Sequence, residues 1–174
     1  IWRRPVLSRT ARRWITMSCA SASDAPASME DHVYAALNSG DISYAELLEG
    51  ALHFSVYVGW AKGLHLNRVI HEQWARIHQE RGLEVPAQAQ THRFDTADDA
   101  VATERAGASY RSVNAVDYVP PPIDPYIEIG VVGYIFGRMW TRPGLDVRAR
   151  RMITLACVGV SDAHIPVQSH VYAA

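Results

Sequence analysis

The chain repeats part of itself at one fixed spacing, and this repeat limits what the chain can fold into. Arg12-Arg13-Trp14-Ile15-Thr16 returns as Arg150-Arg151-Met152-Ile153-Thr154, and His32-Val33-Tyr34-Ala35-Ala36 returns as His170-Val171-Tyr172-Ala173-Ala174. The spacing of about 140 residues is the size of a domain and far exceeds the period of a solenoid. The sequence therefore predicts two copies of one domain.

The repeat also predicts where the two copies lie. Residues 1–83 correspond to the C-terminal part of the first copy, and residues 96–174 correspond to the N-terminal part of the second. Residues 84–95 contain Pro86 and a Gln-Ala-Gln tract without helical periodicity, which is typical of a linker. We expect both copies to be incomplete, because the second stops where the first continues into Leu37-Asn38-Ser39-Gly40.

The composition is ordinary for a soluble globular protein. Of 174 residues, 48% are hydrophobic and 20% are charged, and the net charge is -1. Such a chain lacks the basic surface that binds nucleic acid or anionic membranes, so neither is an expected partner. No apolar run reaches the ~20 residues of a membrane-spanning helix. Cys19 and Cys157 occupy equivalent positions and do not indicate a disulfide framework, so we expect a cytoplasmic protein.

Apolar residues recur at helical spacing through most of the chain. The expected helices cover residues 7–22, 30–39, 43–56, 64–79, 96–113 and 126–140. Their ends carry the usual signals, such as Gly40 as a C-terminal cap and Asp41 or Ser43 as the next N-cap. No alternating run of convincing length indicates a strand. The sequence therefore predicts an all-α fold.

One expected helix carries the polar side chains most suggestive of chemistry. Glu46, Glu49, His53, Tyr57 and Trp60 are three or four residues apart, so they share one helix face. A carboxylate four residues before an imidazole can orient the ring and raise its basicity, as a general acid or base requires. The alternative is a helix surface with a salt-linked histidine. The sequence has no HExxH motif or paired cysteines, so no metal site is expected.

The repeat keeps several polar residues in both copies. The retained pairs are His32 and His170, Arg12 and Arg150, and Arg4 and Arg142. A retained histidine favours a proton-transfer role, although a cap or a core hydrogen bond would also explain it. A retained arginine could clamp a substrate carboxylate through two hydrogen bonds or tie helices together.

Several segments occur together in this chain: Trp140-Thr141-Arg142-Pro143-Gly144-Leu145, Arg148-Ala149-Arg150, His32, Ala36-Leu37-Asn38-Ser39-Gly40, and Glu46, Glu49, His53, Tyr57 and Gly59. In this combination they resemble the carboxymuconolactone decarboxylase family, an all-α group that includes the alkylhydroperoxidase AhpD. The resemblance implies an AhpD-like helical bundle. It also implies a homo-oligomer, a trimer or hexamer of domains.

The resemblance narrows the expected chemistry. In the peroxidase branch of the family, a CxxC motif lies just ahead of the histidine. The corresponding positions here are Ala25 and Ser28 before His32, and Ala163 and Pro166 before His170. Without either thiol, disulfide-based peroxide reduction is not expected. What remains resembles the cysteine-free decarboxylase branch.

The resemblance therefore implies a lyase that needs no cofactor and acts on a small carboxylated, lactone-like substrate. It implies catalytic roles for His32, Glu49, His53 and His170, and substrate contacts for Arg142, Arg150, Trp140 and Tyr57. An arginine would seat the carboxylate, and His32 or His170 would move the proton, with His53 held by Glu49. The alternative is a non-catalytic helical oligomerisation module that kept the fold and lost the reaction.

Overall fold

The computed structural model describes residues 5–87 and 99–174, and within them every regular element is a helix and there is no strand, as the all-α prediction requires. The helices are α1 (Arg9–Ala22), α2 (Pro26–Ser39), α3 (Tyr44–Val58), α4 (Trp60–Glu80), α5 (Asp99–Asn114), η1 (Tyr126–Met139), α6 (Val147–Val160) and α7 (His164–Tyr172). None of these helices is long and apolar enough to cross a bilayer. Most of the expected linker, residues 84–95, falls outside the described residues.

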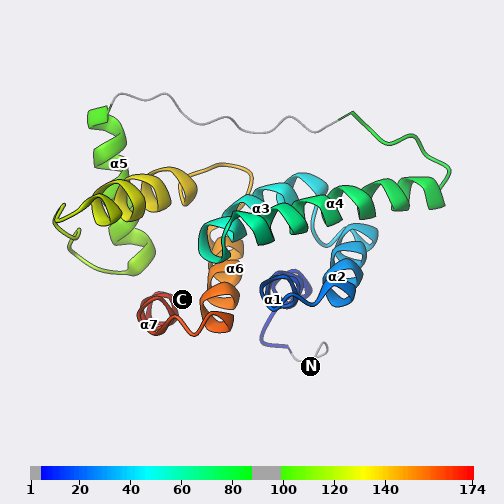
Figure 1. Ribbon diagram of the computed structural model, residues 1–174, viewed down its shortest axis with the longest axis horizontal. Coiled ribbons are helices and arrows are strands. Elements are labelled where there is room, and N and C mark those ends of the chain that lie inside the picture. Colours follow the sequence, from blue (N-terminus) through cyan, green and yellow to red (C-terminus); the bar gives the residue numbers. More distant parts are fainter. Residues whose placement is uncertain (1–4, 88–98) are drawn as a thin grey trace.

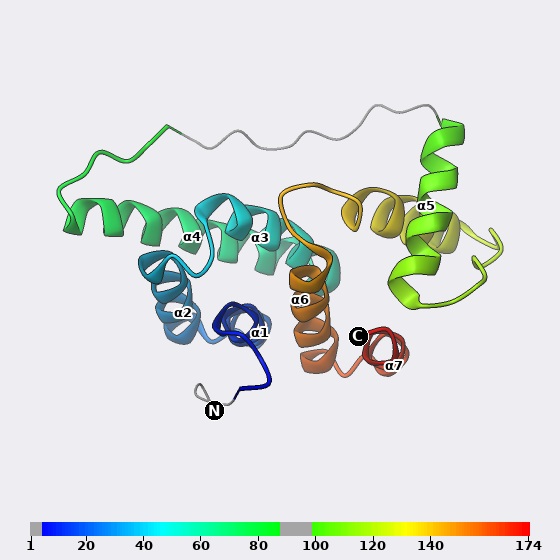
Figure 2. The same cartoon turned by 180° about the vertical axis from the view of Figure 1, so that it is seen from behind.

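The first four helices and α6 form the main body of the molecule (Figure 1). In it α3 lies along α4, α2 packs against α1 and α4, and α6 packs against α1 and α3. The pair α5 and η1 lies at one end of this body, and α7 packs on α6, as the reverse view also shows (Figure 2). Residues far apart in sequence therefore meet where α3, α6 and the end of η1 come together.

The sequence repeat returns as matching helices. The first residues of α1 and α6, Arg9 and Val147, are 138 positions apart, and so are their last residues, Ala22 and Val160. Each helix begins after an N-cap residue whose side chain accepts a backbone hydrogen bond. Ser8 accepts from the N–H of Ala11 in α1, and Asp146 accepts from the N–H of Ala149 in α6. Equivalent residues of the two copies thus start from the same local geometry, and α1 and α6 pack against each other.

Two apolar clusters hold the helices together. The larger one joins Trp14, Phe54, Ile70 and Ile153 with other side chains from α1 to α4 and α6. The smaller one contains the buried Val113, Phe136 and Trp140. Because Tyr57 on α3 packs against both clusters, it connects the main body to the α5–η1 pair.

The helix of residues 126–139 differs from the expected α-helix. It is a π-helix, η1, in which a backbone N–H bonds the carbonyl five residues earlier, as at Trp140 N to Ile135 O, 2.9 Å. A glycine within a helix can allow the close approach of a neighbouring helix. Gly137 does so, because a Cβ built on it would lie 2.8 Å from the Cβ of Ala106 on α5.

Gly63 makes the corresponding close contact between α3 and α4. A Cβ at Gly63 would overlap the Ser55 side chain and lie 3.2 Å from the Ser55 Cα. We expect Gly63→Ala to lower the free energy of unfolding by about 1–3 kcal/mol through overpacking. Gly159→Ala on α6 is the control, because nothing lies within 4 Å of that Cβ position. It should be neutral or stabilising. Urea unfolding measures both, and equal effects of the two variants would contradict this packing.

Candidate functional site

Glu49 on α3 forms a buried ion pair with Arg142, which lies between η1 and α6. Arg142 donates from Nε to Oε2 of Glu49 at 2.9 Å and from Nη2 to Oε1 at 2.5 Å. The two side chains are only 9% and 7% exposed. Such a bidentate pair fixes both groups in one geometry. The predicted pairing of Glu49 with His53 is therefore wrong in this structure, since the carboxylate is held by Arg142 instead.

His53 is fully buried one turn further along α3. Its Nε2 lies 2.9 Å from Oγ1 of Thr154, and its Nδ1 lies 3.4 Å from Nη1 of Arg150. A guanidinium can only donate, so Nδ1 accepts and Nε2 carries the hydrogen. Burial and the positive charge of Arg150 hold the pKa of His53 well below its usual value. The ring is therefore a neutral N–H donor at neutral pH rather than a ready base.

His170 on α7 has the same arrangement with a different arginine. Its Nδ1 lies 2.7 Å from Nη1 of Arg151, and its ring stacks on Trp140 with centroids 5.8 Å apart. Arg151 also donates to the Val113 carbonyl and lies over the Trp140 ring. Burial, and then the charge of Arg151, lower the pKa of His170 to about 4. This imidazole is therefore neutral as well.

Tyr57 and Trp140 form the wall between the two histidines. Trp140 donates from Nε1 to the Tyr57 hydroxyl at 2.7 Å. The His53 ring lies 5.3 Å from the Tyr57 ring and 5.0 Å from the Trp140 ring, measured between centroids. Burial raises the pKa of Tyr57 to about 12 despite hydrogen bonds from Trp140 and Thr154. The phenol therefore keeps its proton across the physiological range.

We call these side chains the Arg–His cluster. Its members are Glu49, His53, Tyr57, Trp140, Arg142, Arg150, Arg151, Thr154 and His170. They come from α3, the end of η1, the loop before α6, and α6 and α7. Seven of the eight predicted site residues thus meet in one buried group. The cluster arises because α3 packs on α6 and α7 packs on α6.

Arg150 is the member with unused hydrogen-bonding capacity. Its side chain is fully buried, and it donates from Nη2 to the Arg142 carbonyl at 2.8 Å. Its Nε is buried without a hydrogen-bond partner. An unpaired buried donor costs about 1–3 kcal/mol, so such groups are rare and demand an explanation. The cluster also holds three buried or half-buried guanidinium groups but only one carboxylate. This excess of positive charge favours the binding of an additional anion.

The remaining predicted residue, His32, does not join the cluster. It lies half-exposed on α2, which packs against α1 and α4. Burial and then Arg13 lower its pKa, while Asp31 raises it. The repeat relates it to His170, but the retained histidines have different surroundings.

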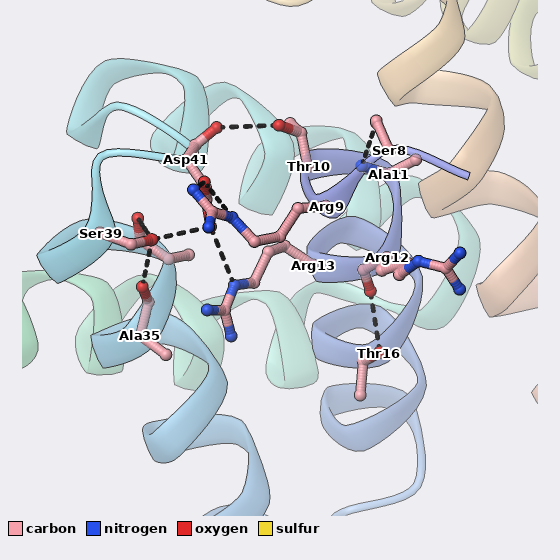
Figure 3. Close-up of polar contacts among 11 residues, drawn as sticks. Ser8, Arg9, Thr10, Ala11, Arg12, Arg13, Thr16, Ala35, Ser39 and Asp41 are labelled. Carbon is pink, nitrogen blue, oxygen red and sulfur yellow. Dashed lines mark hydrogen bonds and ion pairs between the residues drawn. The ribbon is translucent and has the colours of Figure 1, made fainter. Parts of the chain in front are cut away.

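In the first copy, the Asp41 carboxylate binds two arginines of α1. Arg13, the counterpart of Arg151, points toward Asp41, and so does Arg9 (Figure 3). Nε of Arg9 and Nε of Arg13 lie 2.7 and 3.3 Å from the Asp41 carboxylate, which also accepts from Ser39 at 2.8 Å. Burial alone would raise the pKa of Asp41, but these three hydrogen bonds lower it. Arg13 is thus part of a structural ion pair.

The sequence reasoning missed two members of the cluster, Arg151 and Thr154. The signal was present, because the repeat also retains these residues as Arg13 and Thr16. Neither Arg151 nor Thr154 stands three or four positions from a residue with which it would form an acid–base pair on one helix face. Arg151 gains its role from His170, 19 positions later, and Thr154 from His53, 101 positions earlier.

The cysteines lie outside this chemistry. Cys157 is fully buried and Cys19 is half-buried. Burial raises the pKa of both thiols, so neither is an activated thiolate nucleophile at neutral pH. Within the described residues, no three His, Cys, Asp or Glu side chains converge as a metal site would require.

Comparison with known proteins places the chain in no established group. No protein-family model matches it, and no curated protein matches it significantly. The resemblance to the carboxymuconolactone decarboxylase family therefore stays a prediction that rests on the residues themselves.

Proposed function

We propose that the Arg–His cluster binds a small organic carboxylate and removes its carboxyl group as CO2, without a cofactor. The single observation that carries this proposal is Arg150, a fully buried guanidinium whose Nε has no partner. A substrate carboxylate would satisfy this donor and balance the excess of positive charge. Arg142 lies in the loop before α6, and Arg150 lies on α6. This order of the two arginines resembles the decarboxylase branch of the family.

The cluster supplies the other groups that such a reaction needs. Loss of CO2 breaks the bond between the carboxyl carbon and its neighbour and leaves the electron pair on the conjugated lactone as an enolate. Neutral N–H and O–H groups can donate hydrogen bonds to such an anion and stabilise it without changing their own protonation state. His53, His170 and Tyr57 are all neutral at pH 7. One proton, replenished from solvent, then restores the carbon, so the net change is loss of CO2 and gain of H⁺.

The roles differ from those first expected. His53 and His170 act as neutral donors through Nε2, because each Nδ1 is turned toward an arginine. His53 would exchange its bond to Thr154 for one to the substrate anion. Glu49 acts through Arg142, whose backbone carbonyl in turn accepts from Arg150. Glu49 is therefore a positioning residue, and Arg150 is the residue that would touch the substrate.

Arg150→Lys tests this assignment. Lysine keeps the charge but cannot present two parallel N–H groups to a carboxylate. We expect KM for a carboxylated lactone to rise on the order of tenfold or more, while the melting temperature stays close to that of the wild type. Arg148→Lys, an exposed arginine on the same helix, is the control and should leave KM unchanged. An unchanged KM in folded Arg150→Lys would refute the role of Arg150.

A second function, a helical oligomerisation module, is favoured by one observation on α7. Val33 on α2 is fully buried, whereas its repeat counterpart Val171 is 60% exposed. Ile165 and Tyr172 on the same helix are 77% and 80% exposed. An apolar face that is covered in one copy and open in the other is typical of an association surface.

This second function makes its own prediction. Light scattering at micromolar concentration should show a homo-oligomer, and Val171→Asp should dissociate it because a charge would be buried without a partner. Val6→Asp, at an exposed valine outside α7, is the control and should leave the mass unchanged. A monomeric wild type would contradict the oligomerisation function. An oligomer that shows no turnover would favour this function over the proposed lyase activity.

A further inference from the structure

A pocket lies between α3 and α4, which run side by side (Figure 1), and it shares no residue with the Arg–His cluster. Its volume is about 410 Å³, within the range of small-molecule sites. Its lining comes from residues 48–55 of α3 and residues 60–67 of α4. We call it the α3–α4 pocket.

Three small residues form the floor of this pocket. Ala51 and Ser55 on α3 and Gly63 on α4 are all buried. A Cβ at Gly63 would overlap the Ser55 side chain, so the two helices approach here more closely than a larger residue would allow. Ser55 donates its hydroxyl hydrogen to the Ala51 carbonyl at 2.8 Å. The floor therefore needs no polar group from a ligand.

The walls of the pocket are apolar side chains that water reaches. Leu48 and Leu52 on α3 are half-buried. Trp60 and Leu64, one turn apart on α4, are 59% and 70% exposed. A ligand that covers these side chains removes their apolar surface from water, which is favourable. The walls therefore select a ligand with an apolar body.

The pocket is closed at both ends along the two helices. Tyr44, one turn before the pocket on α3, stacks on Trp74 of α4 with centroids 4.8 Å apart, and its hydroxyl lies 2.5 Å from Nδ1 of His71. At the other end, α3 passes into α4 at Gly59. The space between these ends is about two helical turns long. It therefore suits a small molecule better than a partner helix.

The polar character of the pocket is neutral. Among the described residues that line it, none is charged. The neighbouring cations are paired elsewhere, Lys62 with Asp24 and Arg68 with Glu72, each at 2.8 Å. Asn67 is half-buried, and its amide forms no hydrogen bond with the residues that the structure describes. The one available polar group is thus an amide, which can donate and accept.

We propose that the α3–α4 pocket binds a flat, neutral aromatic molecule with one hydrogen-bonding group. The ring lies against Leu52, Trp60 and Leu64, and its hydroxyl or carbonyl group meets the Asn67 amide. Stacking on Trp60 and the burial of leucine surface supply the affinity, and the hydrogen bond sets the orientation. This site is independent of the proposed reaction, whose substrate is a carboxylate.

The test is titration calorimetry of the whole chain with 2-naphthol and its charged analogue 2-naphthoate. Trp60→Ala and Leu64→Glu change exposed wall residues, so both variants should fold. Each should weaken 2-naphthol binding on the order of tenfold, the first by loss of stacking and the second by desolvation of its carboxylate. Tyr172→Ala and Leu83→Glu are the matched controls at exposed positions outside the pocket and should change nothing.

Two further results test the polarity. Asn67→Leu should weaken 2-naphthol roughly two- to tenfold, as expected for one neutral hydrogen bond. Any binding of 2-naphthoate should be the same in all these variants, because its charge finds no partner in the α3–α4 pocket.

The proposal is overturned if 2-naphthol does not bind at millimolar concentration, or if the wall variants and their controls have equal effects. Unchanged 2-naphthol binding by Asn67→Leu would overturn the assigned orientation. If Leu64→Glu instead dissociates an oligomer, as seen by light scattering, this surface is an interface between copies of the chain and the proposal is wrong.

Discussion

Glu49→Gln is expected to lower the free energy of unfolding by about 3–5 kcal/mol, because it leaves the buried Arg142 without its counter-charge. Both oxygens of Glu49 bind Arg142, and water reaches neither group freely. The loss is large compared with the 5–15 kcal/mol that stabilises a typical domain. Urea unfolding of the wild type and the variant gives the difference directly.

A double-mutant cycle separates the ion pair from other effects of Glu49. Replacing both partners, as in Glu49→Leu with Arg142→Met, removes the unpaired charge and should recover much of the stability. Glu72→Gln, which breaks the exposed pair with Arg68, is the control and should change stability little. Purely additive losses at Glu49 and Arg142 would mean that the ion pair is not formed. A stronger coupling of Glu49 with His53 than with Arg142 would restore the pairing first expected.

Acid is expected to destabilise the protein between pH 6.5 and about 4, through the buried histidines. In the unfolded chain a histidine titrates near pH 6.5. In the folded chain the pKa of His170 is about 4, and that of His53 is also lowered. As pH falls through this window, the unfolded state binds protons that the folded state does not. Stability is therefore complete above pH 6.5 and declines toward pH 4.

The size of this effect follows from the pKa of His170. Moving from about 6.5 to about 4 corresponds to about 3 kcal/mol, since each pKa unit is worth about 1.4 kcal/mol. The contribution of Asp41 has the same sign but falls mainly below pH 4, because its pKa in the folded chain is lowered. The loss of stability between pH 6.5 and 4 therefore measures the contribution of the buried histidines.

His170→Gln tests this reading. The variant should lose less stability than the wild type between pH 7.5 and 4, as measured by urea unfolding at closely spaced pH values. His164→Gln changes an exposed histidine of the same helix and should follow the wild-type curve. If His170→Gln keeps the full pH dependence, the neutral, arginine-bound imidazole is not present in solution.

The sequence predicted the helices well, because the signals for helices are local. The capping box at Ser43 and Glu46 marks the start of α3, and Gly40 ends α2 in the left-handed conformation, with φ of 68°. Glu46, which shared a face with Glu49 in the expected site, serves this cap instead. The π geometry of η1 could not be predicted, since an apolar, glycine-containing run fits helices of either pitch.

The sequence predicted which residues belong to the site better than it predicted which side chains bind one another there. Seven of the expected residues meet because the repeat and the helix face select positions that point inward. Which side chain binds which depends on packing between helices far apart in sequence. Arg142 reaches Glu49 across 93 positions, whereas the spacing of four residues suggested His53. Asp41 binds Arg13 across 28 positions, a separation that no local sequence pattern marks.

The proposed reaction is tested most directly by CO2 release. The folded chain is incubated in D2O with a carboxylated lactone labelled with ¹³C at its carboxyl carbon, and ¹³CO2 and deuterium in the product are measured. We expect ¹³CO2 above the uncatalysed rate, with one deuterium gained per CO2 lost. His53→Leu, which removes this N–H donor, should reduce the rate roughly 10²–10³-fold if the variant is folded by its melting temperature. Release of ¹³CO2 no faster than in buffer, or at the same rate with His53→Leu, would contradict the assignment of the Arg–His cluster as a decarboxylating site.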